Sequence, residues 1–475
     1  MNDLLKLSLI EVKNAIAEKR VSATEVTKAA LDRIDEASEL NAVLTVDREG
    51  ALAAAAAADE KLSRGESAGR LGGVPVLVKD NISTRGVRTT CASKFIENYV
   101  PPFDATVVKK LKEAGAVILG KTNMDEFAMG SSNENSAFGF VRNAVDSTRV
   151  PGGSSGGSAS AVAAFEAYGS LGSDTGGSIR QPASFCGVVG LKPTYSAVSR
   201  YGLIAFASSL DQIGPLTRTV ADNALLFDVI AGHDPMDSTS SPEKIDYTDY
   251  EIGVKGMTIG IPKEFFAKDF SPVVREKVMD AAAFYEKSGA KLKDVSISSF
   301  DAALATYYVL ACAEASSNLA RFDGVKYGER VEGADYIDSY YRSRTAGFGA
   351  EVKRRIMIGN YVLSSGYYDA YYLKASKVRT KIKADFDAAL RGCDLLLGPT
   401  SPTTAFEIGK KVKDVTETYM SDIFTVPVNI AGLPAISIPC GTDGQGLPIG
   451  LQLIGRAFGE RTLFGAAEAF EKENA

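Results

Sequence analysis

The chain has 475 residues, of which 45% are hydrophobic and 24% charged, and its formal net charge is -6 at neutral pH. This length allows two or three domains, or one large domain, and the composition is typical of a globular protein. The excess of acidic residues argues against a chain that binds nucleic acid through its own electrostatic field.

The first part of the chain predicts a helical N-terminal segment over residues 1–65. Residues 1–8 contain an early acid and no long apolar core, so we do not expect a secretory signal. Ser8 with Glu11 and Ser22 with Glu25 have the spacing of capping boxes, each before apolar residues at helical intervals. An alanine-rich tract at 51–58 is a strong helix former.

The pattern changes after Gly65, and we assign residues 66–475 to one catalytic domain. Short apolar runs that predict buried strands lie at 74–79, 116–119, 187–191, 257–261, 291–297, 394–397 and 435–439. Helical patterns lie at 106–114, 220–230, 272–288, 301–320, 350–363, 367–391 and 460–472. Short strands between amphipathic helices predict an α/β sandwich with a mostly buried sheet. No run approaches the roughly 18 apolar residues of a membrane span, so we expect no membrane partner.

Glycine and serine crowd into residues 152–158, directly before a helical run at 159–167. A phosphate-binding P-loop would need a lysine where Ser158 stands, so a non-catalytic nucleotide-binding module would rest on glycine content alone. A flexible linker is disfavoured because the helical run follows without a break. The third interpretation is a catalytic loop whose hydroxyl groups take part in chemistry.

A second glycine–serine loop follows at residues 171–182. Glycines before a serine let backbone N–H groups converge on one point, and in acyl transfer such groups stabilise the oxyanion of the tetrahedral intermediate. Ser178, at the start of a predicted helix, is then the candidate nucleophile. Taken alone, the same pattern fits a tight turn with a helix-capping serine at least as well.

A nucleophilic serine needs a base, and the chain has one histidine, His233, in a turn flanked by glycine and proline. This count excludes a metal site built on several imidazoles and leaves the role of His233 open. A lysine can serve if burial keeps it neutral, and Lys79 closes the apolar run at 74–78. Its side chain could equally leave the core for solvent. Ser154 or Ser155 could relay a proton between Lys79 and Ser178.

The cysteines are five in number, scattered, and without C-x-x-C spacing. They predict buried thiols in a reducing cytoplasm, with neither disulfides nor a zinc site. The most basic run, at 374–383, has helical spacing and predicts a solvated helix face in preference to a tRNA or membrane patch.

Three motifs, in this order, resemble the amidase signature family: Lys79-Asp-Asn-Ile, Pro151-Gly-Gly-Ser-Ser-Gly-Gly-Ser and Gly172-Ser-Asp-Thr-Gly-Gly-Ser-Ile-Arg180, extended by residues 181–194. The resemblance implies an α/β/α sandwich with a large mixed sheet and a Ser–cis-Ser–Lys triad. By motif position, Ser178 would be the acyl-forming nucleophile, Ser154 the cis-serine relay and Lys79 the ultimate base. The oxyanion hole would use the backbone N–H groups of Thr175, Gly176, Gly177 and Ser178.

Longer stretches, at 120–131, 198–218, 351–357, 364–372, 398–400 and 427–434, resemble one branch of that family, the glutaminase subunits of tRNA-dependent amidotransferases. This resemblance implies hydrolysis of glutamine and delivery of ammonia to a partner subunit, which converts Glu-tRNA(Gln) to Gln-tRNA(Gln). It also implies a heterotrimer with two other subunits, in which the mischarged tRNA is bound mainly by the partner. No cofactor is expected in this chain, since ATP and Mg²⁺ would act in the partner.

Free glutamine carries an α-carboxylate and an α-amino group, so its recognition calls for one positive and one negative side chain. By position in the family's pattern, Arg355 would bind the carboxylate, for which its planar fork is suited, and Asp422 would bind the amine. Tyr307 would form a polar aromatic wall. The neighbours Arg354 and Tyr308 leave open which residue of each pair faces the site, and Asp422 could be a surface acid.

Two other functions remain open at this point. A stand-alone amidase of the same family would use the same triad on small amides, and only the Arg355 and Asp422 pair and the longer stretches argue against it. A nucleotide-binding module is the alternative of another class. The choice between Glu-tRNA(Gln) and Asp-tRNA(Asn) would belong largely to the partner.

Overall fold

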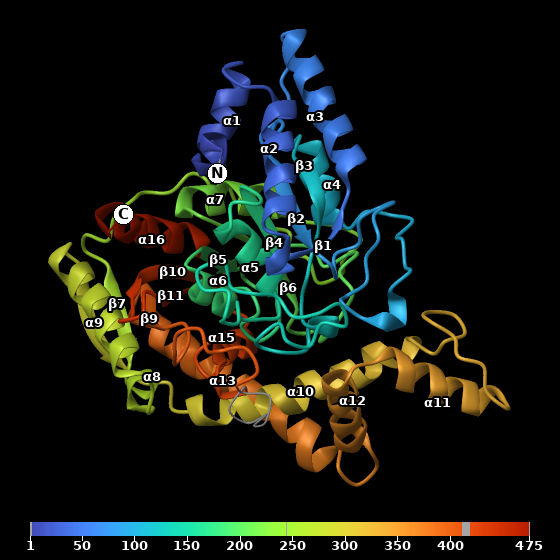
Figure 1. Cartoon of the computed structure of the whole chain (residues 1–475). Helices are drawn as coiled ribbons and strands as arrows, with labels where there is room; N and C mark the ends of the chain where they lie inside the picture. The colour runs from blue at the N-terminus through green and yellow to red at the C-terminus, as the bar shows by residue number, and fades with distance from the viewer. Residues whose placement is uncertain (1, 244, 411–418, 475) are drawn as a thin grey trace.

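The computed structural model describes residues 2–243, 245–410 and 419–474 (Figure 1). Its strands are β1 Val43–Val46, β2 Pro75–Lys79, β3 Val117–Thr122, β4 Gly169–Asp174, β5 Val189–Lys192, β6 Gln212–Thr217, β7 Thr258–Pro262, β8 Lys291–Val295, β9 Leu395–Pro399, β10 Ala435–Thr442 and β11 Pro448–Gly455. Its α-helices are α1 Leu9–Ala17, α2 Ala23–Glu36, α3 Arg48–Ser63, α4 Thr106–Glu113, α5 Gly156–Ala163, α6 Arg180–Cys186, α7 Val220–Ile230, α8 Lys263–Ala267, α9 Pro272–Lys287, α10 Ala303–Asn318, α11 Tyr336–Gly347, α12 Ala350–Leu363, α13 Lys374–Arg391, α15 Val426–Ala431 and α16 Glu460–Asn474. Short 3₁₀ turns lie at Asp3–Lys6, Ser38–Leu40, Lys94–Ile96, Glu126–Ala128, Phe300–Ala302 and Leu319–Arg321, and a π-helical segment at Asp369–Leu373.

One mixed sheet runs through the described residues, in the order β1-β3-β2-β4-β6-β5-β10-β11-β9-β7-β8. Toward its two ends the pairing is parallel: β2 with β3 and β4, and β7 with β8 and β9. The centre, from β4 through β6, β5, β10 and β11 to β9, is antiparallel. Strands β2, β4, β6, β9 and β11 are buried along their whole length, which is typical of a sheet covered on both faces.

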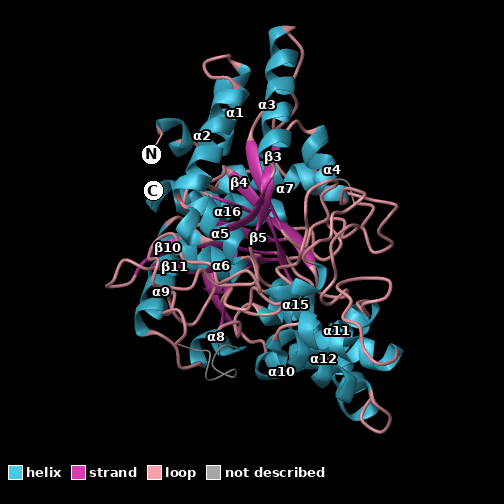
Figure 2. Cartoon of the chain, turned by 45° about the vertical axis from the view of Figure 1, so that its right-hand side comes forward, coloured by secondary structure: helices cyan, strands magenta, loops and turns pink. Residues whose placement is uncertain are grey.

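Helices surround this sheet (Figure 2). α5 and α6 pack together and form a separate apolar cluster with Leu216 of β6. α7, α16 and α9 pack in series and belong to the main hydrophobic core, which also takes in Ile213 of β6. The alternation of a strand sends Ile213 and Leu216 to opposite faces. The predicted α/β/α sandwich with a large mixed sheet is therefore confirmed.

The helices expected in residues 1–65 are present as α1, α2 and α3. Ser8 and Ser22 each form a complete capping box with the glutamate three residues on. The strand β1 was not predicted; it lies antiparallel to β3 at the edge of the sheet. Asp222 of α7 accepts the backbone N–H groups of Leu9 and Ile10, which fixes the start of α1 to α7.

Three further strands, β4, β6 and β11, were missed by the sequence analysis. The sequence of β4 is Gly-Ser-Leu-Gly-Ser-Asp and that of β6 contains both glycine and proline, so neither has the composition of a strand. Each becomes extended because it pairs with a neighbour on both sides. The missed strand β4 is the one that leads into the second glycine–serine loop.

The helices α10 to α13 extend away from the sheet at the lower edge of Figure 1. α10 packs against both α12 and α13. The predicted helix at 301–320 is α10 with a 3₁₀ turn at each end, and the predicted helix at 367–391 is the π-helical segment followed by α13. The lysines of the basic run at 374–383 are exposed, as expected. None of the helices in the described residues is long and apolar enough to cross a membrane.

Candidate active site

Lys79, the last residue of β2, lies at the centre of the site. Its side chain is fully buried, and its Nζ atom lies 2.8 Å from Oγ of Ser154, 2.8 Å from Oγ of Ser155 and 2.9 Å from Oγ of Ser173. Burial lowers the pKa of Lys79 from 10.5 to about 7. The side chain therefore does not leave the core for solvent, and a neutral amine is accessible near neutral pH.

The first glycine–serine loop is closely packed against protein atoms. Its Gly153–Ser154 peptide bond is cis, and Ser154 is fully buried. A Cβ placed on Gly153 would lie 2.0 Å from Oδ2 of Asp125, and one on Gly157 would lie 2.3 Å from the carbonyl oxygen of Asn123. The glycines thus allow other protein atoms to approach the loop closely, and the loop leaves no open space for a phosphate group. This geometry contradicts the nucleotide-binding alternative.

Ser155 joins the two glycine–serine loops. Its hydroxyl donates to the carbonyl oxygen of Ser173 at 3.0 Å, and its backbone N–H donates to the carbonyl oxygen of Ser178 at 3.1 Å. Ser158, inside α5, donates instead to the carbonyl oxygen of Leu171. The structure therefore brings Lys79, Ser154 and the Ser178 loop together, with Ser155 holding the loops in place.

Ser178 lies between the end of β4 and the start of α6, with 8% of its surface exposed. Just before Ser178, the backbone N–H of Gly177 donates to Oδ1 of Asp174 at 2.8 Å. Gly177 was predicted as an oxyanion donor, but this bond already uses its N–H group, so that assignment is corrected. Within the described residues the N–H groups of Thr175, Gly176 and Ser178 make no hydrogen bond to protein, and they remain the candidate donors.

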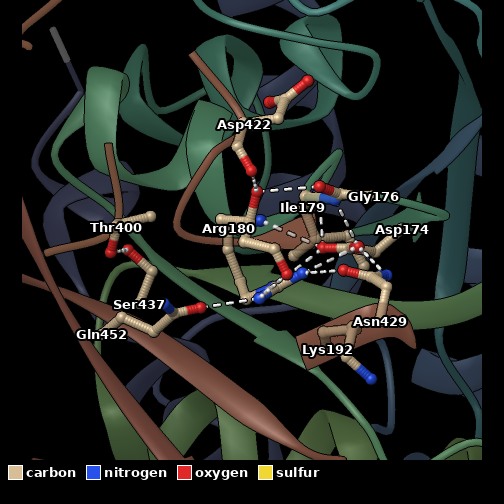
Figure 3. A network of polar contacts seen from close by, with 12 residues as sticks. Asp174, Gly176, Ile179, Arg180, Lys192, Thr400, Asp422, Asn429, Ser437 and Gln452 are labelled. Atoms are coloured by element: carbon tan, nitrogen blue, oxygen red, sulfur yellow. Dashed lines mark hydrogen bonds and ion pairs between the residues drawn. The ribbon is translucent and has the colours of Figure 1, made fainter. Parts of the chain in front are cut away.

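Asp174 and Arg180 form a fully buried ion pair beside Ser178 (Figure 3). Nε of Arg180 lies 3.1 Å from Oδ2 of Asp174, and Nη2 lies 3.2 Å from Oδ1. Arg180 also donates to Oε1 of Gln452 on β11 at 2.6 Å and to Oδ1 of Asn429 on α15. Burial alone would raise the pKa of Asp174, but the Arg180 charge and its hydrogen bonds hold it at about 2. The carboxylate is therefore ionised whenever the protein is folded near neutral pH.

Sequence reasoning gave no role to either member of this pair, although both stand in the motif that ends at Arg180. An acid and an arginine inside one glycine–serine stretch could have indicated this ion pair, because a buried charge needs a partner of opposite sign. Gln452 and Asn429 could not be found this way, because they lie more than 240 residues away and reach the site only through the sheet and α15.

Two other buried carboxylates, those of Asp125 and Asp211, act on Lys79. Burial raises the pKa of each to about 6. Asp125 accepts the N–H groups of Asn133 and Asn135, while Asp211 accepts the hydroxyl of Thr175 at 2.7 Å. Their charges favour the protonated lysine and so oppose the larger effect of burial. Neither acid was predicted from the sequence.

Arg355 is the inward member of the predicted arginine pair. Its side chain is 2% exposed, whereas that of Arg354 is 43% exposed. Nε of Arg355 donates to Oε1 of Glu351 at 2.8 Å. The guanidinium lies over the rings of Tyr308 and Tyr419 at 5.3 and 5.4 Å. Helix α12 therefore presents one fixed cation to the interior.

Asp422 is buried and is not the surface acid that the sequence left open. Its Oδ2 atom accepts the hydroxyl of Ser131, while Oδ1 has no hydrogen-bond partner in the described residues. Burial raises the pKa of Asp422 to about 7, and the charge of Arg355 opposes this shift. A buried oxygen without a partner is a suitable acceptor for an incoming cationic group.

Tyr307 lies against residues 175–178, which carry the candidate oxyanion donors and are called the oxyanion loop below. A Cβ placed on Gly176 would be 2.6 Å from Cζ of Tyr307, so only glycine fits beneath this ring. The charges of both Arg355 and Asp422 act on the phenol of Tyr307, which places all three predicted substrate residues in one neighbourhood. Tyr308 stacks on Tyr419 with ring centroids 4.0 Å apart, so the two tyrosines of the pair face different partners.

The structure also places the single histidine and the five cysteines. His233 is exposed in the turn after α7. Cys91, Cys186, Cys312 and Cys393 are buried as predicted, and Cys440 is half-buried. Within the described part of the chain no group of three or more His, Cys, Asp or Glu side chains is arranged to hold a metal ion.

Comparison with known proteins shows the family of this chain. The family model for amidases matches residues 25–464. The A subunit of glutamyl-tRNA(Gln) amidotransferase from Carboxydothermus hydrogenoformans is 59% identical, over 99% of this chain and 98% of that protein. Its counterpart from Caldanaerobacter subterraneus is 58% identical, over 99% and 97%.

Solved structures are similar over nearly the same length. The A subunit of glutamyl-tRNA(Gln) amidotransferase from Thermotoga maritima superposes with a TM-score of 0.83 at 47% identity, covering 99% of this chain and 96% of that one. The peptide amidase from Stenotrophomonas maltophilia superposes with a TM-score of 0.84 at 30% identity, covering 98% and 97%. The chain therefore belongs to the amidase family.

Proposed function

We propose that this chain is the glutaminase subunit of a tRNA-dependent amidotransferase. The observation that carries the proposal is the buried pair of Arg355 and Asp422 beside the Ser178 loop. An enzyme for small amides has no need of two opposite charges beside its nucleophile, whereas a free amino acid presents one group of each sign. The full-length similarity to the A subunits of such amidotransferases supports the same assignment.

In the proposed reaction, Ser178 attacks the side-chain amide carbon of glutamine. Its proton passes to Ser154, and the proton of Ser154 passes to the neutral amine of Lys79, 2.8 Å away. The N–H groups of Thr175, Gly176 and Ser178 stabilise the oxyanion that forms. A pKa of about 7 leaves a large fraction of Lys79 neutral at physiological pH, as a general base requires.

The tetrahedral intermediate collapses when Lys79 returns its proton through Ser154 to the amide nitrogen. Ammonia leaves, and a glutamyl ester remains on Oγ of Ser178. Water then attacks the ester with the same base, giving glutamate and free Ser178. The sum is glutamine plus water to glutamate plus ammonia, so no redox partner or cofactor is consumed in this chain.

Recognition of the amino acid falls to the residues around Tyr307. Arg355, oriented by Glu351, binds the α-carboxylate, and the unpartnered Oδ1 of Asp422 accepts the α-ammonium group. Tyr307 forms the wall between these charges and the oxyanion loop. Binding of the ammonium group would also stabilise the ionised form of Asp422.

The ammonia serves a partner subunit in this proposal. That partner uses ATP and Mg²⁺ to activate the side-chain carboxylate of Glu-tRNA(Gln), which the ammonia converts to Gln-tRNA(Gln). The names of the relatives, each the A subunit of a glutamyl-tRNA(Gln) amidotransferase, support a complex of several subunits. We propose a cytoplasmic heterotrimer in which the mischarged tRNA binds mainly to the partner, in keeping with the acidic charge of this chain.

The test is ammonia release from glutamine by the purified chain, alone and with the two other subunits co-purified from its source. Release from glutamine, transferred to Glu-tRNA(Gln) when the subunits and ATP are present, is expected. A stand-alone amidase is the second candidate, since peptide amidase shares the fold. Rapid turnover of apolar amides without activity on glutamine would support that candidate and reject ours.

A further inference from the structure

Thr425 touches both the proposed ammonium site and the oxyanion loop. The residue is fully buried at the start of α15, and its hydroxyl lies 2.8 Å from the carbonyl oxygen of Gly176 and 3.1 Å from that of Asp422. Its backbone N–H donates to the carbonyl oxygen of Asp422 at 3.1 Å. No role follows for it from the triad or from the substrate residues.

The hydroxyl of Thr425 holds one end of a peptide unit whose other end is held by Asp174. That unit joins Gly176 to Gly177: its carbonyl oxygen accepts from Thr425, and its N–H donates to Oδ1 of Asp174 at 2.8 Å. With both ends fixed, the plane of the peptide cannot turn. The N–H groups on either side, those of Gly176 and Ser178, keep the direction needed to meet an oxyanion.

Contacts on the far side of Thr425 strengthen this link. Arg180 donates to the carbonyl oxygen of Thr425 at 3.2 Å, so the ion pair that fixes Asp174 also fixes Thr425. A Cβ placed on Gly177, where φ is +136°, would lie 2.2 Å from Oγ1 of Thr425. The side chain of Thr425 lies so close to the backbone of Gly177 that a shift of Thr425 must displace the loop.

Asp422 is the point at which substrate can act on this link. It lies three residues before Thr425, and its Oδ1 atom is buried without a partner in the described residues. An ammonium group bound there supplies the missing partner and fixes Asp422. Because the carbonyl oxygen of Asp422 accepts the backbone N–H of Thr425, fixing one residue fixes the other.

We propose that Thr425 is a positioning residue that couples binding of the α-ammonium group at Asp422 to the alignment of the oxyanion loop. The inference rests on the proposed glutaminase function. It means that the α-amino group of glutamine increases the rate of the chemical step as well as the affinity, since the group's binding energy orders the donors used in the transition state. An amide without that group would bind and react slowly.

The test compares L-glutamine with 4-carbamoylbutanoate, which has the same amide and carboxylate but no amino group. The full chain is assayed, with its partner subunits where the wild type needs them. Thr425→Val replaces the hydroxyl with a methyl of similar size, and Thr425→Ser keeps the hydroxyl. Thr400→Val is the matched control, because Thr400 is also buried and its hydroxyl bonds to that of Ser437 (Figure 3).

Thr425→Val is expected to lower kcat for glutamine about tenfold, the effect of losing roughly one hydrogen bond, with little change in KM. The ratio of kcat values for the two substrates should fall toward one, while Thr425→Ser and Thr400→Val keep the wild-type ratio. An unchanged ratio in a folded Thr425→Val protein would overturn the coupling, whether both rates stay high or both fall equally.

Two further measurements distinguish a variant that does not fold, a failure of the proposed function and a failure of the coupling. If Thr425→Val does not fold, Thr425→Ala removes the hydroxyl without adding bulk and should give the same fall in the ratio. If wild-type protein releases no ammonia from glutamine under any condition, the proposed function fails, and the coupling fails with it. Wild-type glutaminase activity with equal kcat values for the two substrates would reject the coupling alone.

Discussion

The Nζ atom of Lys79 lies 2.8 Å from Oγ of Ser154, with the amine fully buried at the end of β2 and the serine in a loop 75 residues later. The one histidine of the chain, His233, is exposed in the turn after α7. The base of this site is therefore a lysine whose pKa is lowered by burial, and its chemistry follows from how the two glycine–serine loops enclose it.

The triad assignment predicts that Ser178→Ala and Lys79→Ala each lower kcat by at least about 10⁴-fold, since members of such a unit act together. Ser160→Ala, a buried serine of α5 that bonds to the carbonyl oxygen of Arg142, should keep its activity. Ammonia release measures the first effect, and circular dichroism checks the fold. Full activity in either triad variant would reject the assignment, as would an ester probe attached to a cysteine.

A pKa of about 7 for Lys79 predicts how the rate depends on pH. The base works as the neutral amine, so kcat should be low at about pH 5.5, rise through about pH 7 and reach a plateau above it. The ratio kcat/KM reports the free enzyme, in which Asp422 also ionises with a pKa of about 7, so its rise should be steeper than that of kcat. A kcat that is constant from about pH 5.5 to about pH 9 would contradict a lysine base.

The assignment of Arg355 predicts a loss of affinity on conservative change. Arg355→Lys keeps the charge but loses the planar fork, so KM for glutamine should rise about tenfold or more. Arg354→Lys, on the same helix but 43% exposed, should leave KM within about twofold, as surface changes usually do. If the two variants have equal KM values, Arg355 does not bind the carboxylate.

The ion pair of Asp174 and Arg180 predicts a large effect on stability. Asp174→Asn leaves Arg180 buried without a counter-charge and should lower the free energy of unfolding by about 3–5 kcal/mol. Asp387→Asn, which breaks the exposed pair with Lys383, should cost less than about 0.5 kcal/mol. Urea unfolding measures both. Equal, small effects would show that the buried pair does not hold the loop.

The sign of the pH dependence follows from the depressed pKa of Asp174. Its folded value is about 2 and its unfolded value about 3.9, so the unfolded chain binds more protons between them. The stability from this carboxylate is complete above about pH 4 and is lost as the pH falls through about 2. Wild-type protein should therefore lose more stability than Asp174→Asn over this acidic range.

The sequence by itself determined the fold class, the order of most elements and the motifs of the site. Helical periodicity, capping residues and short apolar runs are local properties, so α7 and α12 were predicted at their observed bounds. Lys79, Ser154 and Ser178 could be named because they stand in short motifs, and the single histidine removed the usual alternative base.

Only the tertiary structure decided what surrounds those residues. β4 and β6 are strands because neighbours pair with them, against their own composition. The lowered pKa of Lys79, the use of the Gly177 N–H by Asp174, and the link through Thr425 all depend on burial and on contacts between distant segments. Desolvation and hydrogen-bond geometry depend on how distant segments pack together. The spacing of residues along the chain therefore does not determine them.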